Sequence, residues 1–105
     1  DMFIIRGVNV FPSQVEAALL AVEGTLPHYQ IILTREKDLD RMEVQVEITE
    51  EFFSDRVREM EDLRAKIAGS IESTVQLRAK VVLVEPHTIE RSMGKAKRVV
   101  DRREM

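Results

Sequence analysis

A stripe of apolar residues at helical spacing is the strongest constraint on the fold of this 105-residue chain. Between positions 57 and 75 an apolar residue returns every three or four positions, so these side chains share one face of an α-helix. We expect a long amphipathic helix that Ser54 or Asp55 caps at its start. Such a helix buries its apolar face by packing on a sheet. The stripe consists of Val57, Met60, Leu63, Ile67, Ile71 and Val75.

A second apolar pattern has a period of two residues. From Met42 to Ile48, apolar and polar side chains alternate strictly, which is typical of a strand with one buried and one solvated face. This alternation predicts that Glu43 and Glu47 lie on the solvated face and do not form a paired-carboxylate site. The apolar run 31–33 precedes it, and the polar stretch 34–41 indicates a solvated turn. Together these segments predict an antiparallel hairpin.

Shorter signals complete the predicted fold. The apolar, β-favouring residues 3–5 predict a strand, and residues 7–9 predict a turn in which Gly7 permits unusual backbone angles. Pro12 suits the first turn of a helix that Gly24 and Pro27 end. A last strand covers residues 79–84. The buried face of the first helix is expected to contain Val15, Ala18, Leu19 and Val22.

The resulting βαββαβ order predicts an α+β fold. It consists of a small mixed β-sheet with two main helices packed on one face, followed by a basic C-terminal tail. Residues 91–104 hold six cationic side chains against two carboxylates, a local charge of +4, which leaves −7 on the rest of a chain whose net charge is −3. We expect the tail after about Ser92 to be mobile, because it has few apolar anchors.

Several classes of function are excluded by composition. The chain has no cysteine, which rules out disulfides, thiol nucleophiles and cysteine metal sites. No apolar run comes near the roughly 18 residues of a membrane span. His28 and His87 lack a ligand array at metal spacing, so no metal site is expected. The tail lacks interleaved aromatic residues and the body is acidic, which argues against nucleic-acid binding.

Two segments hold the remaining chemistry. In residues 92–98, Gly94 lets the backbone approach a ligand and Lys95 offers a compact positive charge for a phosphate or carboxylate. A solvated basic turn explains that segment equally well by itself, and it lacks the second glycine of a Walker A loop. In residues 7–13, the apolar Val8, Val10 and Phe11 either pack at the helix start or contact a partner.

Taken together, the segments Arg6–Glu16 (RGVNVFPSQVE) and Gly94–Asp101 (GKAKRVVD) resemble two motifs of the phenylacetate–coenzyme A ligase family. This family belongs to the adenylate-forming, or acyl-CoA synthetase, superfamily. The resemblance covers essentially the whole chain as a C-terminal lid domain, residues 1–105. Because the chain begins abruptly at Asp1, we expect a fragment of a longer protein whose large N-terminal ATP-binding domain is absent.

The resemblance implies a cytoplasmic enzyme that works in two steps. Its own N-terminal domain, the partner of this one, binds ATP, Mg²⁺ and an aryl carboxylate such as phenylacetate. The enzyme first forms an acyl-adenylate and pyrophosphate. The lid then rotates, and coenzyme A attacks to give a thioester and AMP. Neither nucleic acid nor a membrane takes part, and the isolated domain is expected to be inactive and to hold no cofactor tightly.

The resemblance also assigns roles to individual residues. Lys95 matches the catalytic lysine of the first step, with Gly94 and Arg98 as supporting residues. Gly7, Val8 and Asn9 match the loop that lines the coenzyme A tunnel after rotation, and Val10 and Phe11 match positions at the domain interface. Asp1 matches a position at or beside the hinge. The superfamily often has a proline before the arginine of the last motif, whereas Glu90 precedes Arg91 here.

A different class of function stays open from the residues alone. A βαββαβ domain can act by itself as a ligand-binding or dimerisation module with no catalysis, an alternative that depends on fold analogy. It predicts a native chain that starts near Asp1 and forms a symmetric dimer. The intact mass of the native protein distinguishes the two hypotheses.

Overall fold

A four-stranded mixed sheet with strand order β5-β4-β3-β6 forms the centre of the fold, seen in a computed structural model that describes residues 2–89 and 98–103. Strands β3 (Thr25–Glu36) and β4 (Leu39–Ile48) form a long antiparallel hairpin in the middle of this sheet. At the edges, β5 (Lys80–Val84) runs parallel to β4 and β6 (Val99–Asp101) runs parallel to β3.

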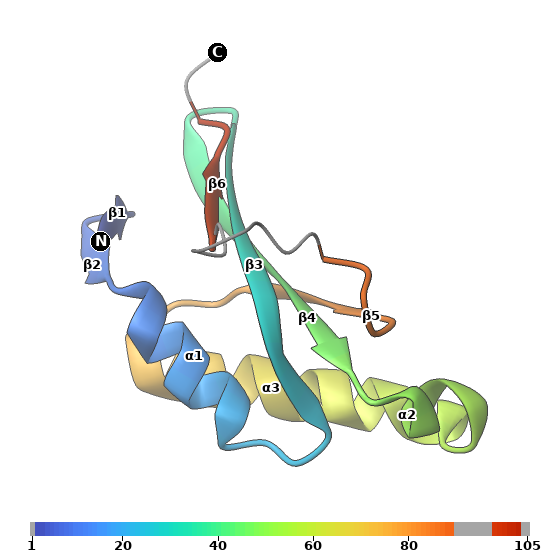
Figure 1. Ribbon diagram of the computed structural model, residues 1–105. Coiled ribbons are helices and arrows are strands. Elements are labelled where there is room, and N and C mark those ends of the chain that lie inside the picture. The colour runs from blue at the N-terminus through green and yellow to red at the C-terminus, as the bar shows by residue number, and fades with distance from the viewer. Residues whose placement is uncertain (1, 90–97, 104–105) are drawn as a thin grey trace.

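The helices pack together on one side of this sheet (Figure 1). Helix α1 (Pro12–Leu20) contacts α3 (Met60–Val75) and strand β3, and α3 also contacts β5. A short helix α2 (Glu50–Ser54) and a 3₁₀ turn η1 (Val57–Glu59) connect β4 to α3. This arrangement confirms the predicted α+β class, with a small mixed sheet and two main helices on it.

The predicted apolar faces form the core. On β4 the alternating residues from Met42 to Ile48 are buried, and on α3 four members of the helical stripe are buried. Their burial stabilises the fold by roughly 1.5–3 kcal/mol per large side chain. Val57, the first member of the predicted stripe, is instead 56% exposed. The buried members on α3 are Leu63, Ile67, Ile71 and Val75.

The boundaries of three elements differ from the prediction. The long helix begins at Met60, because the chain first forms α2 and η1, so neither Ser54 nor Asp55 caps it. The turn of the hairpin contains only Lys37 and Asp38, which have positive φ angles, while residues 34–36 and 39–41 continue the ladder. Residues 99–101 of the basic tail form β6, because Val99 and Val100 pair with β3 and gain its hydrogen bonds.

The predicted turn at residues 7–9 is also wrong. Val8 and Asn9 belong to strand β2 (Val8–Val10), which pairs antiparallel with β1 (Phe3–Ile5), and only Arg6 and Gly7 form the turn. Their φ angles of 52° and 80° suit a tight two-residue hairpin. This β1–β2 hairpin is a separate sheet, so β1 does not join the four-stranded one.

The prediction that Glu47 lies on a solvated face of β4 is wrong. Its side chain is completely buried, because the segment after β5 folds back across this face of the sheet. The carboxylate accepts hydrogen bonds from the backbone N–H groups of His87, at 3.0 Å, and Ile89, at 2.9 Å. A buried carboxylate is tolerated where several donors satisfy it. Glu47 therefore fastens residues 87–89 to the central sheet.

Candidate functional site

The tip of the β1–β2 hairpin is open on the side where Gly7 would carry a side chain. A β-carbon built on Gly7 would have no atom within 4 Å. The glycine is therefore required by its positive φ angle and not by packing inside this chain. An open backbone at a rigid tight turn lets a ligand approach closely.

The two faces of this hairpin differ sharply. Phe3, Ile5 and Val10 point into the core and are nearly or completely buried. Ile4 is 51% exposed on the opposite face, where Asn9 lies beside it in register. Val10 is therefore a core residue and does not lie at a surface interface, whereas Phe11 is 44% exposed at the start of α1.

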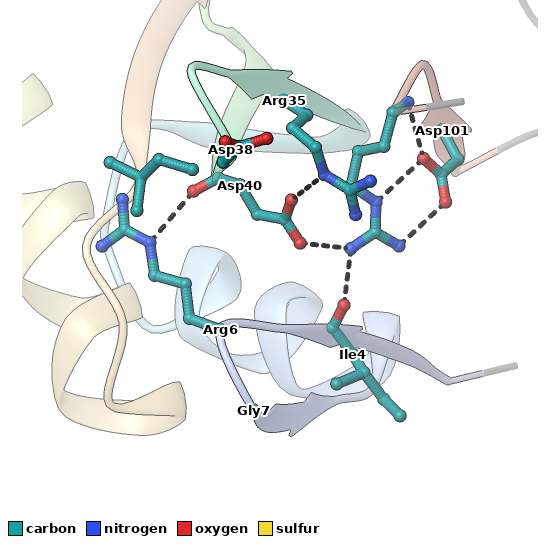
Figure 2. A pocket seen from close by; sticks show the side chains of 9 residues that line it. Ile4, Arg6, Gly7, Arg35, Asp38, Asp40 and Asp101 are labelled. Atoms are coloured by element: carbon teal, nitrogen blue, oxygen red, sulfur yellow. Dashed lines mark hydrogen bonds and ion pairs between the residues drawn. The ribbon is translucent and has the colours of Figure 1, made fainter. Parts of the chain in front are cut away.

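A pocket of about 780 Å³ lies between this hairpin and the turn of the β3–β4 hairpin. Figure 2 shows Ile4, Arg6 and Gly7 on one side of it, facing Asp40 and Arg35 of the central sheet. Asp101 reaches it from β6. The lining combines three arginines with three aspartates, so their formal charges balance. The lining residues are Ile4, Arg6, Gly7, Arg35, Asp38, Leu39, Asp40, Asp101 and Arg103.

Arg103 is the centre of the hydrogen-bond network in this pocket. Its Nη1 donates to the carbonyl oxygen of Ile4 at 2.6 Å and to Asp40 Oδ2 at 2.9 Å. Its Nε and Nη2 donate to the two carboxylate oxygens of Asp101 at 3.0 and 2.9 Å. The Arg103 side chain is only 14% exposed. One planar guanidinium thus joins the hairpin, β4 and β6.

Asp40 makes the second connection to the hairpin. Its carbonyl oxygen accepts a hydrogen bond from Arg6 Nε at 3.0 Å, and its Oδ1 accepts one from Arg35 Nε at 2.8 Å. The hydrogen bond from Arg35, together with that from Arg103, holds the pKa of Asp40 below its ordinary value. The bonds from Arg103 likewise lower the pKa of Asp101. Both carboxylates therefore stay ionised at neutral pH.

Sequence reasoning did not identify Arg103 or Asp40 as site residues. Arg103 was one of several cations in the tail, and Asp40 lay in a stretch interpreted as a solvated turn. The two are 63 positions apart, and Arg103 is 99 positions from Ile4. No local pattern connects residues so distant in the sequence.

Arg98 holds the start of β6 on the sheet. Its guanidinium carbon lies 4.4 Å from the centre of the Tyr29 ring, and its Nη1 lies 3.4 Å from the Tyr29 carbonyl oxygen. Its own carbonyl oxygen accepts a hydrogen bond from the backbone N–H of Ile31 at 2.6 Å. Lys95, Gly94 and Asp1, to which the resemblance gave catalytic, supporting and hinge roles, lie outside the described residues.

Residues 2–89 and 98–103 contain no metal-binding cluster and no membrane-spanning helix. In this part of the chain, no three His, Asp or Glu side chains come together in a group that could hold a metal ion. None of the helices found there is long and apolar enough to span a membrane.

The fold, the open hairpin tip and the motif-bearing ends identify a class of domain found in adenylate-forming ligases. The chain belongs to the family described as AMP-binding enzyme C-terminal domain, which matches residues 7–103. Its relatives include the phenylacetate–coenzyme A ligase of Thermus thermophilus, 47% identical over 98% of this chain and 26% of that protein. The Escherichia coli ligase of the same name is 40% identical over 98% of this chain and 24% of that protein.

Solved structures agree with this assignment. A domain of phenylacetate–coenzyme A ligase from Bacteroides vulgatus has a TM-score of 0.87 at 32% identity, covering 99% of this chain and 94% of the other. 2-Hydroxyisobutyryl-CoA ligase with 2-HIB-AMP and CoA in the thioesterification state has a TM-score of 0.90 at 38% identity. That match covers 99% of this chain and 22% of the ligase. The chain spans about a quarter of the length of the curated relatives.

Proposed function

We propose that this chain is the C-terminal lid domain of an ATP-dependent aryl-acid coenzyme A ligase, with phenylacetate as the aryl acid. It works with its own larger N-terminal domain, and the isolated domain is inactive because the nucleotide-binding cleft belongs to that larger part. The names of the relatives support the reaction and the acid. The open, positive-φ glycine at the hairpin tip is the structural observation that carries the proposal.

In the first step, a carboxylate oxygen of the acid attacks the α-phosphorus of ATP and pyrophosphate leaves. Both reactants are anions, so a cation between them stabilises the transition state. The resemblance assigns this cation to Lys95, with Gly94 allowing close approach. The resemblance assigns Mg²⁺ and ATP to the larger domain.

In the second step, the thiol of coenzyme A attacks the acyl carbonyl, and AMP and a proton are released. The lid rotates about a hinge at or beside Asp1 so that the β1–β2 hairpin faces the active site. Gly7, Val8 and Asn9 then line the tunnel for the pantetheine arm. The exposed Ile4 and Phe11 beside the hairpin provide apolar surface for the contact with the larger domain.

Substitution of Lys95 by alanine in the complete protein tests this function. We expect the rate of acyl-adenylate formation to fall about 100- to 1000-fold, because removal of one preorganised charge partner costs about 3–4 kcal/mol in the transition state. Thioester formation from supplied phenylacetyl-adenylate should stay near the wild-type rate. Pyrophosphate release measures the first step and loss of free thiol measures the second. Equal losses in both steps would contradict the role of Lys95.

A further inference from the structure

The β1–β2 hairpin needs support from the rest of the molecule. Two-stranded sheets are at best marginally stable in water, and this one has no strand partner in the four-stranded sheet. Phe3, Ile5 and Val10 anchor its inner face in the core. Those contacts bury one face but leave the outer face, with Ile4 and the tip, without an apolar anchor.

Arg103 supplies a polar anchor there instead. Its Nη1 donates at 2.6 Å to the carbonyl oxygen of Ile4, a backbone atom three residues before Gly7. The same guanidinium is held by Asp40 from β4 and by Asp101 from β6, as Figure 2 shows for these two carboxylates. Because arginine presents its donors in a rigid plane, these acceptors fix its direction as well as its distance.

Arg6 makes a second connection between the hairpin and the central sheet, at the turn itself. Its Nε donates at 3.0 Å to the backbone carbonyl oxygen of Asp40, so Asp40 is joined to the hairpin through Arg6 and again through Arg103. Asp40 lies two residues after Asp38, the last residue of the turn, and pairs with Arg35 in the β3–β4 ladder. The segment that leads into Gly7 is thus joined to the central sheet at two points, Ile4 and Arg6.

We infer that Arg103 is a positioning residue for coenzyme A, acting through the β1–β2 hairpin. This inference rests on the proposed function, in which Gly7–Asn9 line the tunnel. Arg103 does not contact the reacting atoms. It fixes the angle of the hairpin relative to the sheet, so the backbone at Gly7 lies where the pantetheine arm passes. Misplacement of a binding group by about 1 Å costs up to about 100-fold in rate.

The test uses the complete protein and compares Arg103→Ala with Arg103→Lys and Arg102→Ala. Arg102 is the matched control, because its side chain is exposed and its backbone N–H, which bonds to Leu33, is kept. With supplied acyl-adenylate, Arg103→Ala should lower kcat/KM for coenzyme A about 10- to 100-fold, mainly through KM. Acyl-adenylate formation should be unchanged. Arg103→Lys, which keeps the charge but not the fork, should fall between, and Arg102→Ala should match the wild type.

Hydrogen exchange gives a readout that does not depend on activity. In Arg103→Ala, the amides of residues 3–10 should exchange faster, while those of α1 and α3 keep their protection. Unchanged kcat/KM for coenzyme A, or equal losses in both half-reactions with faster exchange throughout the domain, would overturn the inference. The variant Gly7→Leu, measured in parallel, distinguishes a failure of the proposed function from a failure of the inference about Arg103. If Gly7→Leu leaves the thioester step intact, the proposed function fails; if it blocks that step and Arg103→Ala does not, only the inference fails.

Discussion

At the scale of the residue, Tyr29 joins the first helix to the last strand. Its ring is buried, its hydroxyl donates a hydrogen bond to Glu16 Oε1 on α1 at 3.0 Å, and Arg98 lies over its face. Burial, followed by the hydrogen bond to Glu16 and the negative charge of Glu16, raises the pKa of Tyr29 from 10.0 to about 12. Ionisation of this phenol therefore opposes folding.

The titration of Tyr29 is a testable consequence. Because the folded pKa is higher than the unfolded one, the contribution to stability is complete below pH 10 and is lost as the pH rises through about 12. Tyr29 is the only tyrosine and the chain has no tryptophan, so phenolate absorbance reports this residue alone. A rapid pH jump should give a native pKa near 12, and urea should lower it to about 10. A native pKa near 10 would contradict the described contacts.

Glu47 shows why single residues could be predicted only in part. The alternation on β4 correctly predicted the burial of its apolar residues, because a strand exposes alternate side chains to opposite faces. It could not predict that the other face is also covered at Glu47 by residues 87–89. That covering segment is about 40 positions away, so local periodicity carries no information about it.

At the scale of the element, helix α3 contains a glycine, Gly69, that packing does not require. Gly69 lies exposed in the interior of this helix, and a β-carbon built on it would have no atom within 4 Å. Glycine in a helix interior is less favourable than alanine because it loses more backbone entropy on folding. Gly24 is the contrasting case, since its φ angle is +105° and its β-carbon would lie 2.6 Å from the Phe52 ring.

Alanine substitution at these two glycines should therefore have opposite effects. Gly69→Ala should raise the free energy of unfolding by about 1 kcal/mol, as expected for an exposed helix interior. Gly24→Ala should lower it by more than about 1 kcal/mol, because the backbone conformation and the contact with Phe52 both disfavour a side chain. Urea unfolding of the isolated domain followed by circular dichroism measures both. A destabilising Gly69→Ala would show that α3 makes contacts at Gly69 that the structure lacks.

The elements themselves were largely predictable, whereas their ends were not. Both main helices and the central hairpin have long periodic patterns, which is why they were found. The start of α3 was predicted too early because the stripe of apolar residues already begins at Val57, in η1. Strand β6 was missed because it has only three residues, and it becomes a strand by pairing with β3.

At the scale of the whole molecule, the four-stranded sheet connects the two regions to which the family resemblance gives separate roles. The β1–β2 hairpin is joined to the sheet through Arg103 and Asp40, and Arg98 fixes the strand that follows the lysine motif. The order of elements predicted the fold class, whereas the role that the resemblance gives to Gly7 stays a prediction. The pocket network could not be predicted, because it forms only when three distant parts of the chain meet.

The most direct test of this account is the thioester half-reaction of Gly7→Leu in the complete protein. The leucine would fill the open side of the turn, so we expect kcat/KM for coenzyme A to fall by at least about 100-fold while acyl-adenylate formation is unchanged. Gly7→Ala is the control, since it imposes the strain of a positive φ, about 1–2 kcal/mol, without the bulk. A Gly7→Leu protein that forms thioester at the wild-type rate would contradict the assignment of this hairpin to coenzyme A.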